Sequence, residues 1–143
     1  MPDCGIHKIL AADDGTPEGE RAAYTAIELA VGLKADVLLL GVVPPQYIDP
    51  MMGPPGYNPA VFRRKMEERF WRFRKFGETL GMDVDVDVVD GRPADQIRKR
   101  AAAEHVDLIV IGRHKVSPFL RLFVGSTSET VVRGAHCSVM VAR

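Results

Sequence analysis

The sequence predicts an α/β protein in which helices cover both faces of a parallel sheet. Short apolar segments, the expected strands, alternate along the chain with longer segments that have apolar residues at helical spacing. Two of the short segments, 36–43 (DVLLLGVV) and 107–111 (DLIVI), are apolar at almost every position, as strands are when helices cover both of their sides. Strands and helices that alternate in this way build a parallel sheet through right-handed crossovers.

Length and composition favour a soluble chain with a single domain over residues 1–143. Of the 143 residues, 46% are hydrophobic and 27% are charged, as in ordinary globular proteins. The 19 basic side chains balance the 19 acidic ones, so no net charge attracts nucleic acid or an anionic membrane. No apolar run reaches the roughly 18–20 residues of a membrane span, and no signal-peptide pattern is present. Cys4 and Cys137 do not make a disulfide framework, so we expect a cytoplasmic protein.

The N-terminal third contains two expected strands with a helix between them. Residues 7–12 (HKILAA) form the first apolar strand, which is followed by an Asp-Asp-Gly-Thr turn. Thr16 and Pro17 are typical of an N-cap and a first helical residue, and the helix is expected to run to about Leu33. The apolar segment 36–43 then forms the second strand.

Residues 44–59 interrupt this alternation. Six of the ten prolines fall there, and proline lacks the N–H that a strand interior needs, so we expect a loop. The loop is long for an α/β connection, and it is interpreted either as a lid or docking surface or as a variable insertion. A second helix is expected from about Pro59 to Leu80. Its expected buried stripe consists of Phe62, Met66, Phe70, Phe73 and Leu80.

The C-terminal half continues the pattern. Residues 82–89 (MDVDVDVV) alternate aspartate with valine, which predicts a strand with one solvated face at an edge of the sheet. Gly91-Arg92-Pro93 opens a third helix, which is expected to end near Glu104. The remaining expected elements are the strand 107–111, a short helix at 126–133 and the last strand, 138–142 (SVMVA).

The last strand indicates contact with another chain. Val139, Met140 and Val141 are consecutive apolar residues, so both faces of this strand are apolar. An exposed strand edge pairs readily with other chains unless it is covered, and a second copy of the chain is the simplest cover. We therefore expect a homodimer that forms through this strand.

The segment after the fourth strand has features of a phosphate-binding site. Ligands of open parallel sheets bind beyond the carboxyl ends of the strands. Gly112 permits a positive φ and a close approach of the backbone. The sequence at 125–128 (GSTS) opens a helix whose free N–H groups suit a phosphate. However, Ser126 and Glu129 also have the spacing of a capping box, which needs no ligand, and both interpretations stay open.

These residues resemble the universal stress protein family. The nucleotide-binding branch of that family has the pattern Gly, two residues, Gly, nine residues, Gly and Ser or Thr. Here the matching stretch is Gly112-Arg113-His114-Lys115, nine residues, and Gly125-Ser126. The resemblance covers the whole chain: ILAADDGT is similar to the family's first strand and turn, DVLLLGVVPP to its second strand, and Gly91-Arg92-Pro93 to its entry into the third helix.

The resemblance implies a fold, an assembly and a ligand. The fold is a Rossmann-like three-layer α/β/α sandwich with a five-stranded parallel sheet of order 3-2-1-4-5, and the assembly is a homodimer through the last strands. The ligand is ATP, with or without Mg²⁺, which the nucleotide-binding branch of the family binds, and its expected role here is that of a regulator in the stress response. Carried over by position, the residues that would bind the ligand are Asp14, Val42, Gly112, Gly125, Ser126 and Thr127. Asp13 is the second choice for the position of Asp14.

Lys115 departs from the family pattern, because it stands where the second glycine is expected. A lysine side chain could close the pocket, and the protein would then be a dimeric interaction module that binds no nucleotide. Alternatively, the Lys115 ammonium, with Arg113 beside it, could pair with phosphates. No catalytic constellation is present, so at most slow ATP hydrolysis or self-phosphorylation at Ser126, Thr127 or Ser128 is expected.

Two other features have simpler interpretations. The second helix carries a strip of basic residues around Trp71, but Glu67 and Glu68 interrupt it, so a solvated helix face explains it better than a nucleic-acid site. The histidines and cysteines do not have a metal-ligand spacing, and we expect no metal site. Cys137 precedes a buried strand and is interpreted as an inert core thiol.

Overall fold

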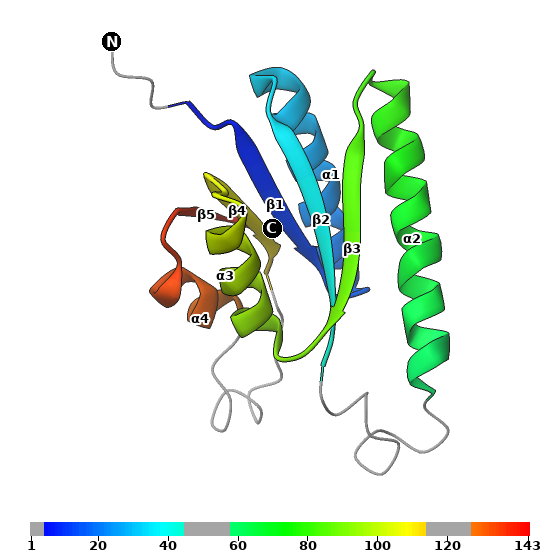
Figure 1. Ribbon diagram of the computed structural model, residues 1–143. Helices are drawn as coiled ribbons and strands as arrows, with labels where there is room; N and C mark the ends of the chain where they lie inside the picture. Colours follow the sequence, from blue (N-terminus) through cyan, green and yellow to red (C-terminus); the bar gives the residue numbers. More distant parts are fainter. Residues whose placement is uncertain (1–4, 45–57, 114–126) are drawn as a thin grey trace.

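The chain forms a five-stranded sheet with the strand order β3-β2-β1-β4-β5, in which every neighbouring pair is parallel (Figure 1). The computed structural model describes residues 5–44, 58–113 and 127–143. The strands are β1 (Lys8–Asp13), β2 (Asp36–Val43), β3 (Val84–Asp90), β4 (Leu108–Gly112) and β5 (Ser138–Ala142). The helices are α1 (Pro17–Leu33), α2 (Pro59–Thr79), α3 (Pro93–Ala103) and α4 (Thr127–Gly134). This confirms the predicted fold class and strand order.

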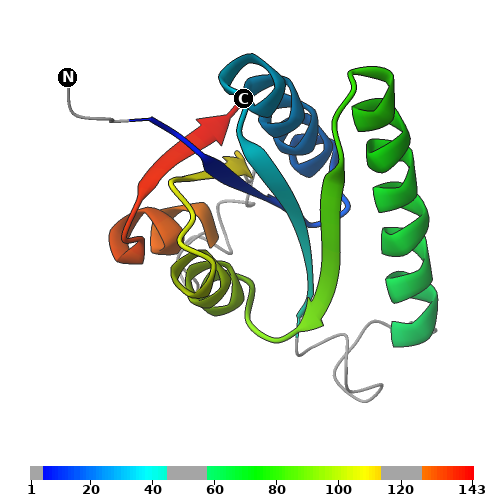
Figure 2. The same ribbon diagram turned by 45° about the horizontal axis from the view of Figure 1, so that its top comes forward.

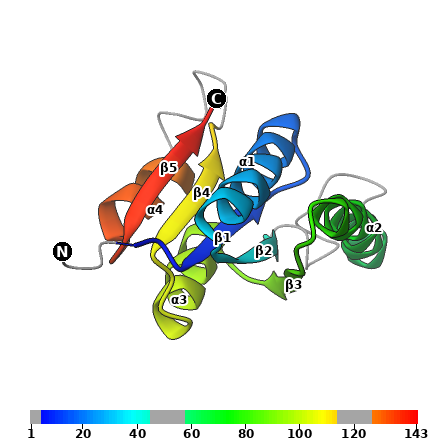
Figure 3. The same cartoon turned by 90° about the horizontal axis from the view of Figure 1, so that it is seen from above.

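The helices form two layers, one on each face of the sheet. Figure 3 shows α1 and α2 on one side of the strands and α3 and α4 on the other. Each layer encloses its own core, because successive residues of a strand point to opposite faces. In β1, for example, Ile9 belongs to the core under α1 and α2, whereas Leu10 belongs to the core under α3 and α4. The inner strands are therefore apolar throughout.

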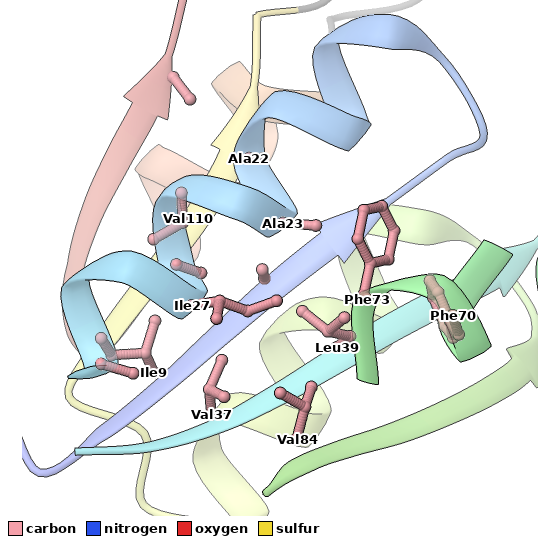
Figure 4. Packing of buried hydrophobic residues seen from close by; sticks show 14 of the residues in the cluster. Ile9, Ala22, Ala23, Ile27, Val37, Leu39, Phe70, Phe73, Val84 and Val110 are labelled. Atoms are coloured by element: carbon pink, nitrogen blue, oxygen red, sulfur yellow. The ribbon is translucent and has the colours of Figure 1, made fainter. Parts of the chain in front are cut away.

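The larger core lies between the sheet and the helices α1 and α2. Phe70 and Phe73 of α2 pack beside Leu39 of β2 and Ile27 of α1, and none of these four side chains is more than 1% exposed (Figure 4). Tyr24 joins this layer from α1, with its ring edge-on to Phe73 at a centroid distance of 5.0 Å. This aromatic packing fixes α2 against α1 and the sheet.

The aspartate–valine segment forms the edge strand that its pattern predicts. β3 pairs only with β2 among the described strands and lies at the opposite side of the sheet from β5 (Figure 2). Val84 faces the α2 core, whereas Asp87 lies on the other face and binds Arg100 of α3 at 2.6 Å. The strand begins at Val84 instead of Met82, two residues later than expected.

The predicted buried stripe of α2 is wrong at its last position. Met66, Phe70 and Phe73 are buried, but Leu80 is 41% exposed because α2 ends at Thr79 and Leu80 is its C-cap. The stripe continues through Gly77 instead, where an added Cβ would lie 2.5 Å from Val84 Cγ2. The helix therefore needs a residue without a side chain at the point where it crosses β3.

Gly41 likewise leaves room for α2, at the point where the helix packs on β2. An added Cβ would lie 2.9 Å from Met66 Cγ and 3.1 Å from Phe70 Cζ, so Gly41→Ala overpacks the contact between β2 and α2. We expect the free energy of unfolding to fall by about 1–3 kcal/mol, measured by urea denaturation. Gly32→Ala in α1 is the matched control, since nothing lies within 4 Å of its added Cβ. The free energy of unfolding of Gly32→Ala should rise by about 0.5–1 kcal/mol. Equal stability of the two variants would contradict the conclusion that an added Cβ at Gly41 overpacks the core.

Candidate functional site

The carboxyl ends of β1, β2 and β4 meet at one edge of the sheet, toward the lower side of Figure 1. In the register of the sheet, Asp13 is the partner of Gly41 and Ala12 is the partner of Ile111. Asp14, Val42 and Gly112 are the residues that follow these positions. The structure thus brings together three of the predicted site residues that lie far apart in the sequence.

Side chains of the turn itself hold the connection between β1 and α1. Gly15 has φ +86°, a conformation that favours glycine. Asp14 Oδ1 accepts hydrogen bonds from Thr16 N at 3.0 Å and from Thr16 Oγ1 at 2.5 Å. Thr16 Oγ1 in turn accepts from Gly19 N at 3.1 Å, so Thr16 is the N-cap of α1 as predicted. Asp14 is exposed at the surface of this turn.

Asp13 has the opposite environment. Its side chain is completely buried and faces α2, where Arg69 Nε donates to Oδ2 at 2.5 Å and Arg69 Nη2 donates to Oδ1 at 3.1 Å. Gly15 N donates to Oδ1 at 3.0 Å. Burial raises the pKa of Asp13, and the hydrogen bond and charge of Arg69 oppose that rise. The Asp13 carboxylate is thus engaged inside the protein, which favours Asp14 over Asp13 as the acidic group available to a ligand.

Arg69 is a residue of this edge that the sequence pattern does not reveal. It belongs to the basic strip of α2 around Trp71, for which the sequence favours a solvated helix face, yet its side chain is only 14% exposed. Trp71, two residues away, is 60% exposed, in agreement with that interpretation. The available signal is helical spacing: Arg69 follows buried Met66 by three residues and immediately precedes buried Phe70, so it flanks the apolar stripe.

Gly112 allows a close approach, but the approaching group belongs to the chain itself. An added Cβ would lie 2.4 Å from the backbone oxygen of Glu18, in the first turn of α1. Gly112 does not adopt the positive φ that a glycine permits, because its φ lies outside the left-handed range. Gly19 makes a similar contact, since its added Cβ would lie 2.4 Å from Asp13 Oδ1 and 2.7 Å from Asp14 Oδ1. Together the two glycines let α1 begin directly against the ends of β1 and β4.

Of the remaining predicted site residues, three lie within the described part of the chain and three lie outside it. Val42 is 5% exposed and packs in the core under α3 and α4, while Arg113 is exposed and donates its backbone N–H to Ala142 O of β5 at 3.0 Å. Thr127 is half-buried and begins α4. Lys115, Gly125 and Ser126 lie outside the described residues, as does the segment 45–57 of the predicted loop.

A groove of about 590 Å³ lies beside the turn, with Gly15 on one side and α2 on the other. Arg69 forms part of its wall, together with Lys65, Phe62 and exposed Trp71. The groove and the turn therefore share Arg69.

Other chemistry-bearing groups do not gather into a second site within the part of the chain that the structure describes. No three histidine, cysteine, aspartate or glutamate side chains of residues 5–44, 58–113 and 127–143 are close enough to hold a metal ion. No helix among these residues is both long enough and apolar enough to cross a membrane. Cys137 is half-buried and packs against the core under α3 and α4, and burial raises the pKa of its thiol.

A doubly wound parallel sheet of order β3-β2-β1-β4-β5, with helices on both faces, defines a Rossmann-like α/β protein. The chain belongs to the universal stress protein family, whose family model matches residues 5–143. A universal stress protein of Thermus aquaticus is 33% identical over 135 residues, which cover 94% of this chain and 97% of the relative. One from Methanocaldococcus jannaschii is 28% identical over 141 residues, or 95% of this chain and 81% of the relative.

Solved structures of universal stress proteins share the fold. A structure from Lactobacillus plantarum superimposes with a TM-score of 0.81 at 24% identity and covers 97% of this chain and 99% of its own. A universal stress protein in complex with cAMP gives a TM-score of 0.70 at 20% identity, with 97% and 98% coverage. One from Archaeoglobus fulgidus in complex with dAMP gives 0.68 at 18% identity, with 96% and 98% coverage.

The Asp13–Arg69 pair predicts a stability effect that depends on pH. Arg69→Met leaves a buried carboxylate without its counter-ion and should lower the free energy of unfolding by about 3 kcal/mol at pH 7. The loss of Arg69 also raises the native pKa of Asp13 further above its unfolded value of about 3.9. The native state then binds more protons than the unfolded state between these two pKa values, so stability falls as the pH rises through that interval. The free energy of unfolding that Arg69→Met loses relative to the unmodified protein should therefore be larger at pH 7 than at pH 4, as measured by urea denaturation.

Arg63→Met is the matched control for this comparison. Arg63 also lies on α2 and pairs with Asp90, but its side chain is 37% exposed. Its loss should cost less than about 1 kcal/mol. If Arg69→Met lowered the free energy of unfolding by the same amount at pH 7 and at pH 4, this would contradict the interpretation that Asp13 is ionised and paired with Arg69.

Proposed function

We propose that this protein is a cytoplasmic, single-domain universal stress protein that binds ATP, with or without Mg²⁺, as a regulatory ligand in the stress response. The observation that carries the proposal is the convergence of exposed Asp14, the end of β2 and Gly112 on one edge of the sheet. Parallel α/β sheets bind ligands at such an edge. The family structures in complex with cAMP and with dAMP support an adenine nucleotide as the ligand class.

The proposed site has an adenosine side and a phosphate side. Asp14 presents a carboxylate that accepts hydrogen bonds from ribose hydroxyls, next to the end of β2 at Val42. The first turn of α1 is already capped, because Gly19 N donates to Thr16 Oγ1 and Glu20 N donates to Thr16 O. The N–H groups of that turn are therefore not the proposed phosphate binders.

The proposed phosphate binders are on the other side of the edge. They are the backbone around Gly112, Gly125 and Ser126, the hydroxyl of Thr127 at the start of α4, and the cations Arg113 and Lys115. ATP is proposed to act as a ligand that is turned over slowly, if at all, with Ser126, Thr127 and Ser128 as the hydroxyls nearest to the phosphates.

The same proposal includes a homodimer through β5. This strand lies at an edge of the sheet (Figure 2). Its residues Met140 and Val141 are 37% and 40% exposed. Val132 of the neighbouring α4 is 52% exposed. Apolar side chains on an edge strand favour pairing with a second strand, and the second copy of the chain supplies one with the same pattern.

Calorimetric titration with ATP and Mg²⁺ tests the ligand. We expect binding to the unmodified protein, and its loss in Gly125→Asp, which adds a carboxylate where phosphates are proposed to bind. Lys115→Gly separates the two roles of the lysine: weaker binding in this variant means that the ammonium pairs with phosphate. Binding by the variant alone would contradict the proposal and identify the protein as an interaction module whose pocket Lys115 closes. Phosphate release well above background would contradict the regulatory role.

The dimer is tested by light scattering of Met140→Lys. An ammonium in place of the exposed Met140 side chain should separate the two copies, because it would be desolvated in a strand-paired interface. Leu33→Lys is the matched control, since Leu33 is 47% exposed on α1. A Met140→Lys protein with an unchanged dimer mass would rule out pairing through β5.

A further inference from the structure

We propose that Arg69 is a positioning residue for the nucleotide site: it holds the turn between β1 and α1 and so fixes the direction of the Asp14 carboxylate. The nucleotide part of this inference rests on the proposed function. The positioning part rests on contacts within the chain.

Arg69 contacts the turn at both of its ends. Its guanidinium donates to Asp13, the last residue of β1, and its Nη2 also donates to the carbonyl oxygen of Thr16 at 2.6 Å. That carbonyl belongs to the N-cap of α1 and accepts the backbone N–H of Glu20 at 3.0 Å. One side chain from α2 therefore joins the end of a strand to the start of a helix.

The guanidinium itself is held in place. It lies over the Phe73 ring, with 5.7 Å between Arg69 Cζ and the ring centroid, and its side chain is 14% exposed. Phe73 is 1% exposed and packs edge-on against Tyr24 of α1. Arg69 is thus anchored to the aromatic layer of the core, and a planar guanidinium in such a position has little freedom to reorient.

Asp14 lies between the two points that Arg69 holds. Its Oδ1 accepts from both the backbone N–H and the hydroxyl of Thr16, so the direction of the carboxylate follows the position of Thr16. Since Arg69 holds the Thr16 carbonyl, a shift of the guanidinium moves the whole turn. Asp14 is the group that would contact the ligand, and Arg69 acts on the ligand only through it.

Arg69 also determines the charge of the turn. Asp13 and Asp14 are adjacent, and the charge of Asp14 disfavours ionisation of Asp13. The guanidinium is the counter-ion of Asp13, which leaves Asp14 as the acid that faces the solvent. Without Arg69, the Asp13 carboxyl group lacks its counter-ion and no longer joins the end of β1 to α2.

Calorimetry with three probes, ATP, adenosine and inorganic tripolyphosphate, tests the inference. Arg69→Met should weaken ATP and adenosine binding by about tenfold, the effect of losing one hydrogen bond to a charged acceptor, and Asp14→Ala should have the same effect. The double variant should lose no more affinity for ATP and adenosine than either single variant, because both substitutions remove the same function, the contact of a positioned Asp14 carboxylate with the ligand. Tripolyphosphate affinity should be unchanged in all three variants.

Arg63→Met is the matched control. Arg63 also reaches from α2 to a strand, where its Nη1 donates to Val88 O at 3.0 Å, but within the described residues its hydrogen-bond partners, Val88 and Asp90, lie on β3 and not in the turn. The Arg63→Met protein should bind all three probes as the unmodified protein does.

If Arg69→Met fails to fold, Arg69→Lys replaces it, because lysine keeps the cation but lacks the second donor group. Arg69→Lys should lose less affinity for ATP and adenosine than Arg69→Met, and its loss should also be non-additive with that of Asp14→Ala.

Amide hydrogen exchange separates this inference from the proposed function. The amides of Gly15 and Thr16 donate to Asp13 and Asp14, so they should exchange faster in Arg69→Met than in Arg63→Met. Unchanged exchange at both amides, additive affinity losses, or an equal loss for tripolyphosphate would overturn the inference. If the unmodified protein binds none of the probes, the proposed function fails, and the exchange rates alone decide whether Arg69 positions the turn.

Discussion

The ion pair between the buried carboxylate of Asp13 and the part-buried Arg69 joins two segments that are 56 residues apart in the chain. Charges inside a protein lose their hydration, and this cost is offset only when hydrogen bonds satisfy both partners. Here two donors of Arg69 and the amide of Gly15 serve the carboxylate, and the Thr16 carbonyl takes a further arginine donor. The arrangement of the β1–α1 turn, and with it the surface offered to a ligand, depends on α2 being docked where Arg69 reaches it.

Close backbone packing is the second constraint at this edge. Gly19 and Gly112 leave room for the first turn of α1 to lie against the ends of β1 and β4, where any side chain would collide with an aspartate or with the Glu18 backbone. These contacts are made within the chain itself. The packing of the fold therefore requires a glycine at position 112 independently of the proposed ligand.

Local patterns predicted the fold well, because each element carries its own signature. The Thr16–Pro17 cap and the aspartate–valine alternation of β3 depend only on neighbouring residues, and both predictions are confirmed. Predictions failed where a distant contact decides. Arg69 resembles any other residue of a basic strip until Asp13 is seen beside it, and Leu80 is exposed because α2 ends one residue earlier. The site at Lys115 and Gly125 stays a prediction.

The outward face of α2 has a property that follows from composition. Trp71 is the single tryptophan of the chain, and it lies two residues from Arg69 with its ring 60% exposed. The ammonium of Lys75 is 5.5 Å from its centroid. Indole emission is sensitive to nearby charge and to water, so the unlabelled protein contains an optical reporter on the very helix that anchors the turn, and any displacement of that helix changes its signal.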